Sequence, residues 1–379
     1  MIPLSEPVLQ GRELEYVGEC LRTGWVSSNG AFVLRFEQAL AEYVGVRHAV
    51  ACDCGTSALH VSLLLSSVGA GDEVIVPAVT FIAPVNAVRY VGAWPVFVDC
   101  DDYCCMDVAG VRRFLTEACD RVDGATVNRK TGRRVAGIIP VHVFGTPADM
   151  DELGALAVEN GLAVIEDASE SLGSRYKGRM CGSLAPMACL SFNGNKIVTS
   201  GGGGAVLTDD DDLAAGARSL TTQAKEAGIE YIHHRVGYNY RMNNVLAAIG
   251  LAQLETIAER LTVKRENFTL YEQALGPAAV RLLGQPAWSD ANRWFYAYLC
   301  EDAAEKDRLL EACIGAGIQA RPLWYPNHLQ RPYAEMEAFD VERALWFYDR
   351  LVNLPCSVSL TGHQVEQVAS VILATTAQD

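Results

Sequence analysis

From residue 48 onward, short apolar runs alternate with segments whose apolar residues recur at helical spacing. Several runs are almost continuously apolar, which is typical of strands in a mostly parallel sheet covered on both faces. The pattern predicts seven strands, at 48–54, 73–78, 95–100, 137–143, 162–167, 187–192 and 203–208. Helices are expected between most of them, at 57–65, 84–90, 108–118 and 150–160. The chain is therefore predicted to be an α/β protein, with helices on both faces of a seven-stranded sheet.

The rest of the chain predicts a second, smaller unit. Helical spacing marks 13–21 and 33–44 before the first strand, and a long apolar-rich helix is expected at 244–259. After a charged stretch near residue 260, helices mix with short strands such as 294–300. Because 379 residues are enough for two domains, we predict a large domain over 1–258, including the N-terminal segment, and a smaller α+β domain over 259–379.

The charge and the hydropathy of the chain exclude several classes of partner. A net charge of -15 argues against nucleic acid, because phosphate backbones favour basic surfaces. No apolar run approaches the roughly 18 residues of a membrane span, and the first seven residues have neither a basic leader nor an apolar signal core. We expect a cytoplasmic protein that binds neither nucleic acid nor a membrane.

The twelve cysteines do not form a recognisable framework. No C-x-x-C pair occurs, and most cysteines lie within apolar runs, as Cys189, Cys300 and Cys313 do. Free cysteine is among the residues most often buried, and a reducing compartment keeps it as a thiol. We therefore expect buried free thiols rather than disulfides or a metal site.

A lysine follows the predicted strand at 187–192. Lys196 lies on a polar loop just past the carboxyl end of that strand, and four glycines follow at 201–204. Open α/β sheets bind ligands at this edge. The lysine could bind phosphate, form a Schiff base or be a solvated surface charge, which is the commonest state of lysine. Because it precedes the glycines, the order is not that of a nucleotide-triphosphate loop, and a Schiff base with an aldehyde cofactor is the better hypothesis.

Two other segments offer groups for a phosphate. The first strand is followed by Gly55, Thr56 and Ser57, which open a helix, and a helix start with free N–H groups and hydroxyls can hold phosphate. A serine or threonine there is also an ordinary helix cap. Ser191, close to the end of the sixth strand, offers a second hydroxyl. Together with the glycines, these residues predict a phosphate site beside Lys196.

Groups for a flat, cationic ring follow two further strands. Phe81 lies after the second strand and could stack on a ring, although an aromatic residue there is more often core. Asp167 ends the apolar fifth strand, where it could cap a turn or pair with a protonated pyridine nitrogen. Taken with Lys196 and the phosphate groups, they predict a pyridoxal phosphate site.

The same residues carry a family resemblance over nearly the whole chain. It resembles the DegT/StrS nucleotide-sugar aminotransferases, which have the aspartate aminotransferase fold (PLP fold type I). The matching segments are Gly55-Thr56 with Ala58-Leu59, Thr80-Phe81, Pro140-Val141-His142, Glu166-Asp167-Ala168, Ser191-Phe192 with Lys196 and the glycines, 237–242, and Ala247-Ala248 with Gln253-Leu254-Glu255.

The resemblance implies roles for individual residues. Lys196 would carry the cofactor, Asp167 would pair with its ring nitrogen, and Thr56 and Ser191 would bind its phosphate. Asn239 would reach the cofactor of a neighbouring subunit, which implies a homodimer with shared active sites. Many members have glutamine where this chain has Glu170, so the contact of this residue with the cofactor is less defined.

The resemblance also implies a reaction. L-glutamate would donate an amino group, and Lys196 would act as general base; its presence favours transamination over the dehydration that some members without this lysine perform. The segment from Glu166 to Gly173 and the Lys196 loop most resemble enzymes that aminate C-4 of a 4-keto-6-deoxy sugar. We expect UDP-4-keto-6-deoxy-N-acetylglucosamine, with GDP-perosamine synthase or a C-3 aminotransferase as alternatives. A regulatory cofactor-binding protein is the non-enzymatic alternative.

Seven residues are candidates for binding the nucleotide sugar, because they form polar or aromatic clusters where related enzymes meet it. They are Trp25, His233, His234, Arg241, Arg321, Trp324 and His328. Trp25 could equally be a packing anchor, and Arg241 could orient a carboxylate or hold a subunit interface. His142, inside a predicted strand, is expected to be a buried histidine rather than an acid or base.

Overall fold

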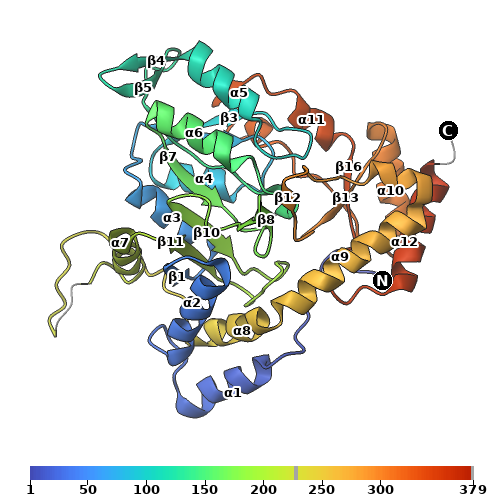
Figure 1. Cartoon of the computed structure of the whole chain (residues 1–379), viewed down its shortest axis with the longest axis horizontal. Coiled ribbons are helices and arrows are strands. Elements are labelled where there is room, and N and C mark those ends of the chain that lie inside the picture. The colour runs from blue at the N-terminus through green and yellow to red at the C-terminus, as the bar shows by residue number, and fades with distance from the viewer. Residues whose placement is uncertain (226–228, 377–379) are drawn as a thin grey trace.

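A computed structural model describes residues 1–225 and 229–376, and its centre is one eight-stranded sheet (Figure 1). In spatial order the strands are β1 (His48–Cys52), β11 (Gly204–Thr208), β10 (Met187–Ser191), β7 (Ala163–Asp167), β6 (Val135–Ile138), β2 (Glu73–Pro77), β3 (Trp94–Val98) and β15 (Glu337–Phe339). β11 runs antiparallel to both its neighbours, and the other pairs are parallel. All seven predicted strands are present.

The expectation of seven strands is one short. The eighth, β15, comes from the C-terminal part of the chain and pairs in parallel with β3, Glu337 opposite Val96 and Phe339 opposite Val98. Phe339 packs edge-on against Phe114 at 5.5 Å between ring centroids. A three-residue edge strand that begins with a glutamate has too little apolar pattern to be seen in the sequence.

Both faces of the sheet are covered, as predicted. Every residue of β2, β6 and β11 is buried, although successive side chains point to opposite faces. The helices are α1 (Glu13–Thr23), α2 (Ala31–Val44), α3 (Gly55–Leu65), α4 (Ala83–Tyr90), α5 (Val108–Arg113), α6 (Met150–Asn160), α7 (Asp211–Thr221), α8 (Asn244–Glu255), α9 (Ile257–Leu275), α10 (Ala303–Gly315), α11 (Arg343–Tyr348) and α12 (Gly362–Thr376). The predicted helix 244–259 is interrupted at Thr256, where α8 ends and α9 begins.

Three small sheets lie outside the central one. They are β12 (Ser289–Asp290), β8 (Arg175–Tyr176) and β9 (Arg179–Met180); β13 (Tyr296–Leu299), β16 (Leu351–Leu354) and β14 (Arg321–Pro322); and the hairpin β4 (Cys119–Val122) and β5 (Ala125–Asn128). Helices α9, α10 and α12 surround a second hydrophobic cluster that includes Phe268, Tyr271 and Tyr298.

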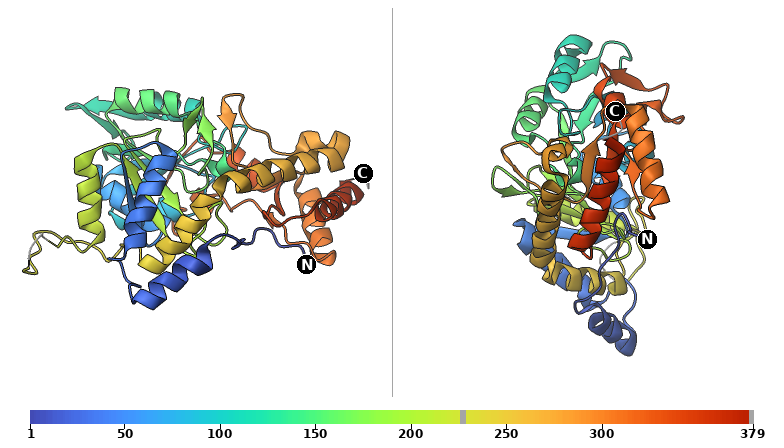
Figure 2. Two further views of the ribbon diagram at one scale, coloured as in Figure 1. Left: turned by 60° about the horizontal axis from the view of Figure 1, so that its bottom comes forward. Right: turned by 90° about the vertical axis from the view of Figure 1, so that its right-hand side faces the viewer.

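The division at 258/259 stays a prediction. Two separate clusters support it, and Figure 2 shows α9 running from the sheet toward α10 and α12, which contribute to the second cluster. Three observations show how closely the parts are joined: Ile2 belongs to the second cluster, Trp294 packs in the first, and β15 completes the central sheet.

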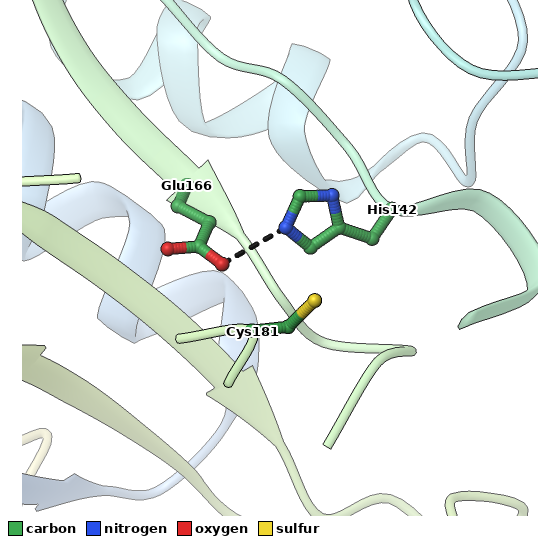
Figure 3. A group of neighbouring side chains, drawn as sticks. All are labelled: His142, Glu166 and Cys181. Carbon is green, nitrogen blue, oxygen red and sulfur yellow. Dashed lines mark hydrogen bonds and ion pairs between the residues drawn. The ribbon is translucent and has the colours of Figure 1, made fainter. Parts of the chain in front are cut away.

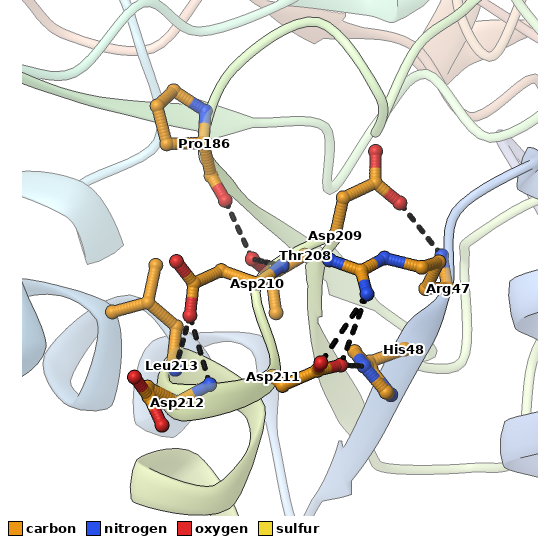
Figure 4. A network of polar contacts seen from close by, with 9 residues as sticks. All are labelled: Arg47, His48, Pro186, Thr208, Asp209, Asp210, Asp211, Asp212 and Leu213. Carbon is orange, nitrogen blue, oxygen red and sulfur yellow. Dashed lines mark hydrogen bonds and ion pairs between the residues drawn. The ribbon is translucent and has the colours of Figure 1, made fainter.

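The acidic run 209–212 is explained by local structure (Figure 4). The Asp210 carboxylate accepts the N–H groups of Asp212 and Leu213 and so caps α7. Asp209 accepts the backbone N–H of Arg47, and Asp211 pairs with the side chains of Arg47 and His48. The run therefore ties the start of α7 to the start of β1.

Cysteine usage agrees with the expectation from the sequence. All twelve cysteines are free, and all but Cys54 are buried. Among residues 1–225 and 229–376, none of the helices has the length and apolarity that a bilayer crossing requires.

Gly204 allows β11 to pass the turn between β1 and α3. A Cβ atom built on Gly204 would lie 2.5 Å from the carbonyl of Cys54 and from the amide nitrogen of Gly55. These are backbone atoms, so a side-chain rotation cannot relieve the clash. The glycine thus fixes the position of the turn that opens α3.

Gly204→Ala should destabilise the cofactor-free chain by about 1–3 kcal/mol, since overpacking forces backbone shifts. The urea midpoint of unfolding measures the effect. Gly154→Ala is the matched control, because Gly154 lies inside α6 and a Cβ atom added there would have no neighbour within 4 Å. That change should stabilise the chain by about 0.5–1 kcal/mol. Equal midpoints for the two variants would contradict the role assigned to Gly204.

Candidate active site

A cavity of about 390 Å³ lies beyond the carboxyl ends of β7 and β10, beside the first turn of α3. It contains most of the residues for which the sequence predicts cofactor contacts, since Gly55, Thr56, Phe81, Asp167, Glu170, Ser191 and Lys196 all line it. Trp324 is the one predicted substrate residue that also lines it. The strand ends thus bring together residues that lie up to 270 positions apart in the sequence.

The Lys196 amine lies between an acid and an aromatic ring. Its Nζ atom is 3.7 Å from Glu170 Oε1 and 3.8 Å from the centroid of the Trp294 ring. The side chain is 13% exposed. Burial lowers the pKa of the amine, while the charges of Glu170 and Asp167 oppose this shift. A lowered pKa makes a lysine a better nucleophile near neutral pH.

Two buried carboxyl groups face the same cavity. Asp167, at the end of β7, accepts the N–H of Ser169 at 3.0 Å, and burial raises its pKa. Glu170 accepts the N–H of Phe144 at 2.9 Å, and burial raises its pKa to about 7. A cationic ring placed against Asp167 would offset the cost of burying its charge.

The opposite end of the cavity offers donors for an anion. Gly55 and Thr56 form the first turn of α3, and Ser191 ends β10 next to them. The N-terminus of an 11-residue helix with two hydroxyl groups beside it suits a phosphate. Ser57 does not line the cavity, because its hydroxyl faces the Cys54 thiol at 3.2 Å. Binding of the phosphate by Ser57 stays a prediction.

Aromatic side chains form one wall. The Phe81 ring is 55% exposed and meets Trp324 edge-on at 6.5 Å, and Trp294 stacks on Phe295 at 4.1 Å. Sequence reasoning missed Trp294 and Phe295 because the pattern of 294–300 indicates only a strand of the second domain. Two adjacent aromatic residues at the very start of that strand were the available signal.

Three candidate substrate residues lie elsewhere. Trp25 is 59% exposed, and Arg321 is exposed on β14 with its guanidinium on the carbonyl of Ala320. His328 is half-buried with its ring 6.3 Å from that of Phe97. None of the three lines the cavity, because their segments turn toward the surface or toward β3.

Arg241 also lies outside the cavity. It forms a buried ion pair with Glu37 of α2, whose carboxylate accepts the N–H of Ala51 at 2.7 Å. The carboxylate that Arg241 orients therefore belongs to this chain. The pair holds α2 against β1 and against the segment that precedes α8, so a contact of Arg241 with substrate is not supported.

His233, His234 and Asn239 lie on an arm, which comprises the described residues 222–225 and 229–240. Figure 1 shows it projecting from the body of the chain between α7 and α8. Both histidines and Asn239 are exposed, and none of them lines the cavity of their own chain. The arm is closed by two isolated bridges, Lys225 with His233 and Thr222 with Asn239.

Figure 3 shows a buried group formed by His142, Glu166 and Cys181, of which Glu166 directly precedes Asp167 in β7. Their possible ligand atoms lie within 4.8 Å of one another, which could suit a metal. Glu166, however, accepts hydrogen bonds from the His142 ring and from the N–H groups of Gly182 and Leu184. The other ring nitrogen of His142 accepts the N–H of Ala148 at 3.1 Å. We interpret the group as a hydrogen-bond network that holds the end of β7.

Comparison with known proteins identifies the family. Residues 7–373 match the DegT/DnrJ/EryC1/StrS aminotransferase family. GDP-perosamine synthase of Caulobacter vibrioides is 39% identical, covering 98% of this chain and 97% of that protein. EpsN of Bacillus subtilis, a putative pyridoxal phosphate-dependent aminotransferase, is also 39% identical, with 98% and 95% covered. GDP-perosamine synthase of Escherichia coli O157:H7 is 36% identical, with 96% and 95% covered.

A solved structure gives the same result. The DegT DnrJ EryC1 StrS aminotransferase from Brucella abortus superposes with a TM-score of 0.88 at 30% identity, covering 96% of this chain and 95% of that one. The chain belongs to the DegT/DnrJ/EryC1/StrS aminotransferase family. Its predicted fold type, its enzyme class and its cofactor, pyridoxal phosphate, are confirmed. The amine, the carboxylate and the anion site of the cavity fit this cofactor.

Glu170 gives a pH-dependent prediction. Its pKa rises from 4.5 to about 7 in the folded chain, so the folded state binds a proton that the unfolded state has lost between these values. Stability conferred by the protonated carboxyl is therefore present at low pH and lost as pH rises through about 7. Glu170→Gln, the glutamine of many family members, removes this dependence.

We expect Glu170→Gln to gain roughly 2–3 kcal/mol of unfolding free energy over the wild type between about pH 5 and about pH 8. Urea unfolding of both cofactor-free proteins across this range measures the difference. Loss of the charge that faces Lys196 acts in the same direction, since it favours the neutral amine. A difference that is constant with pH would contradict the prediction.

Proposed function

We propose that this aminotransferase moves the amino group of L-glutamate to C-4 of a GDP-linked 4-keto-6-deoxy sugar. The observation that supports it most is similarity over almost the full length to GDP-perosamine synthases from two organisms. From the sequence alone this was the alternative, and it now takes precedence over the UDP-linked N-acetylhexosamine. The UDP-linked sugar and amination at C-3 are the second candidates.

Different residues of the cavity bind different parts of the cofactor in this proposal. Thr56, Ser191 and the first turn of α3 hold the phosphate of the cofactor, and Asp167 holds its ring nitrogen. When bound, pyridoxal phosphate supplies an aldehyde that accepts the amino group and a ring that delocalises the charge left by proton removal. Phe81 and Trp324 present flat aromatic surfaces to the ligands.

Lys196 performs the covalent and proton-transfer steps. The neutral form of its amine, which burial favours, is the nucleophilic form that could bond to the aldehyde that the cofactor would supply. The same amine would act as the general base, which takes up a proton in one transfer and, as the ammonium, gives that proton back in the next. Glu170, 3.7 Å away, holds the amine in place and stabilises its protonated form between these transfers.

A second subunit completes the site in our proposal. Among the described residues that line the cavity, Lys196 is the sole basic one, whereas the cofactor, the sugar nucleotide and glutamate are all anionic. The arm carries Lys225, His233, His234 and Arg235, all exposed, and its Ile229 and Val236 are 97% and 80% exposed. Such apolar exposure suits contact with another copy. We therefore propose a homodimer in which Asn239 reaches the phosphate of the partner's cofactor.

The enzyme acts in the cytoplasm in this proposal. Twelve free cysteines suit a reducing compartment, and both proposed substrates are soluble anions. The regulatory alternative finds no support, because the relatives that match at full length are aminotransferases.

The substrate prediction can be tested by absorbance of the cofactor-loaded protein. L-glutamate should convert the aldehyde form of the cofactor to its amine form, and GDP-4-keto-6-deoxymannose should restore it. UDP-4-keto-6-deoxy-N-acetylglucosamine should restore it at least tenfold more slowly, because nucleotide contacts distinguish substrates by a few kcal/mol. Lys196→Ala is the control and should show neither change. Faster recovery with the UDP sugar would replace this substrate assignment.

The shared site can be tested with mixed dimers. Lys196→Ala and Asn239→Ala homodimers should both be inactive or nearly so. In a purified heterodimer, one site keeps Lys196 from one chain and Asn239 from the other. It should therefore regain about half the wild-type turnover.

If Asn239 acted within its own chain, each site of the heterodimer would lack one of the two residues. An inactive heterodimer with intact cofactor binding would thus contradict the shared site. Wild-type turnover in the Asn239→Ala homodimer would contradict a role for Asn239 altogether.

A further inference from the structure

Trp294 contacts the Lys196 side chain from the C-terminal part of the sequence. The indole is 3% exposed, and its face lies 3.8 Å from Lys196 Nζ. Glu170 Oε1 is at 3.7 Å from the same atom. The amine is therefore bounded by an aromatic face and by a carboxyl group, which come from segments more than 120 residues apart in the sequence.

The indole is fixed by its own polar groups. Its Nε1–H donates to the carbonyl of Asn195 at 2.7 Å, so the ring also holds the loop residue that precedes Lys196. The backbone carbonyl of Trp294 accepts a hydrogen bond from Lys264 Nζ at 2.7 Å, and Lys264 is a buried residue of α9. Trp294 thus connects the lysine loop to the helix that leads into the second cluster.

Asn292, two positions before Trp294, connects Trp294 with Glu170, the two residues that flank the Lys196 amine. The Asn292 side chain accepts the N–H of Trp294 at 2.9 Å and donates to the carbonyls of Glu170 and Leu172 at 2.9 and 3.0 Å. Arg293, between Asn292 and Trp294 in the sequence, has a φ of 56°, a left-handed conformation that costs free energy in a residue other than glycine. Because the Asn292 side chain binds the backbone of both residues, the turn 292–294 keeps Trp294 and Glu170 at a fixed relative position.

We propose that Trp294 is a positioning residue that orients the Lys196 amine, anchors its loop and stabilises the protonated form of the amine through its aromatic face. Only the contribution of Trp294 to catalysis rests on the proposed function of Lys196. The orientation and the protonation of the Lys196 amine can be tested in the cofactor-free chain, whatever reaction the enzyme catalyses.

Opposing effects meet at the Lys196 nitrogen. Burial favours the neutral amine, whereas Glu170, Asp167 and the negative face of the indole favour the ammonium form. Glu170 and Asp167 are the charged groups that face Lys196 among the described residues. A lysine that must exist in both forms during one cycle benefits from this balance, because neither form is strongly favoured.

The test is competitive acetylation of the cofactor-free, full-length protein with acetic anhydride across pH. Mass spectrometry of the peptide that contains Lys196 gives the apparent pKa of its amine. Trp294→Phe keeps an aromatic face and loses the indole N–H, whereas Trp294→Leu loses both. Trp288→Leu is the matched control, because Trp288 is 38% exposed and does not line the cavity.

Trp294→Leu should lower the apparent pKa of Lys196 by about half a unit to one unit relative to Trp294→Phe, which follows from the strength of a cation–π contact. Both variants should exchange the amide hydrogens of the segment 193–200 faster than the wild type, since both lose the hydrogen bond to Asn195. The Trp288→Leu control should match the wild type in both measurements. If the Leu variant does not fold, Trp294→Met takes its place in the pKa comparison, since methionine is apolar and has no aromatic face, and the Phe variant still tests the anchoring role.

Equal pKa values in the Phe variant, the Leu variant and the wild type would overturn the electrostatic role of the ring. Unchanged exchange in the Phe variant would overturn its role as an anchor. Failure of the proposed function is distinguishable, because it would appear as turnover by Lys196→Ala and would leave the measured pKa of the wild-type amine unaffected.

Discussion

The site depends on one costly arrangement, the burial of an amine and two carboxyl groups around a single cavity. Removing an ion from water costs several kcal/mol, and only close partners offset that cost. Lys196 faces Glu170, while Asp167 has the N–H of Ser169 as its nearest donor. Asp167 is therefore the group with the most to gain from a cationic ligand. This imbalance explains why the cavity suits a protonated ring and why burial displaces all three pKa values.

The rest of the fold supports this arrangement through strand pairing and through hydrogen bonds of buried side chains. β7 and β10 end side by side, with Cys189 paired to Asp167, so the ends of the two strands are held in register. Glu166, directly before Asp167, accepts three hydrogen bonds from elements on either side of the strand. Gly204 lets β11 pass close to the turn that opens α3. The anion site and the carboxylate thereby keep a fixed separation.

The sequence predicted the part of the site that depends on local pattern. Lys196 and Thr56 each follow a recognisable apolar strand and Asp167 ends one, and strand ends meet at one edge of a parallel sheet whatever the details of packing. Trp294 and Asn292 could not be found in this way, because their positions depend on contacts between segments more than 90 residues apart. β15 was missed for the same reason, since pairing with β3 rather than its own sequence makes it a strand.

The candidate substrate residues show a different limit. Arg241 is a plausible carboxylate ligand from its sequence, and it does bind one, but the carboxylate is that of Glu37. The sequence indicates that an arginine will pair with an anion. It does not show whether this anion is a ligand or a carboxylate of the same chain. His233, His234 and Asn239 are the reverse case, because they have the chemistry of a binding site and do not line the Lys196 cavity of their own chain. In the homodimer that we propose, the arm of one copy would bring basic side chains to the cavity of the other, where Lys196 is the sole basic residue among the described lining residues.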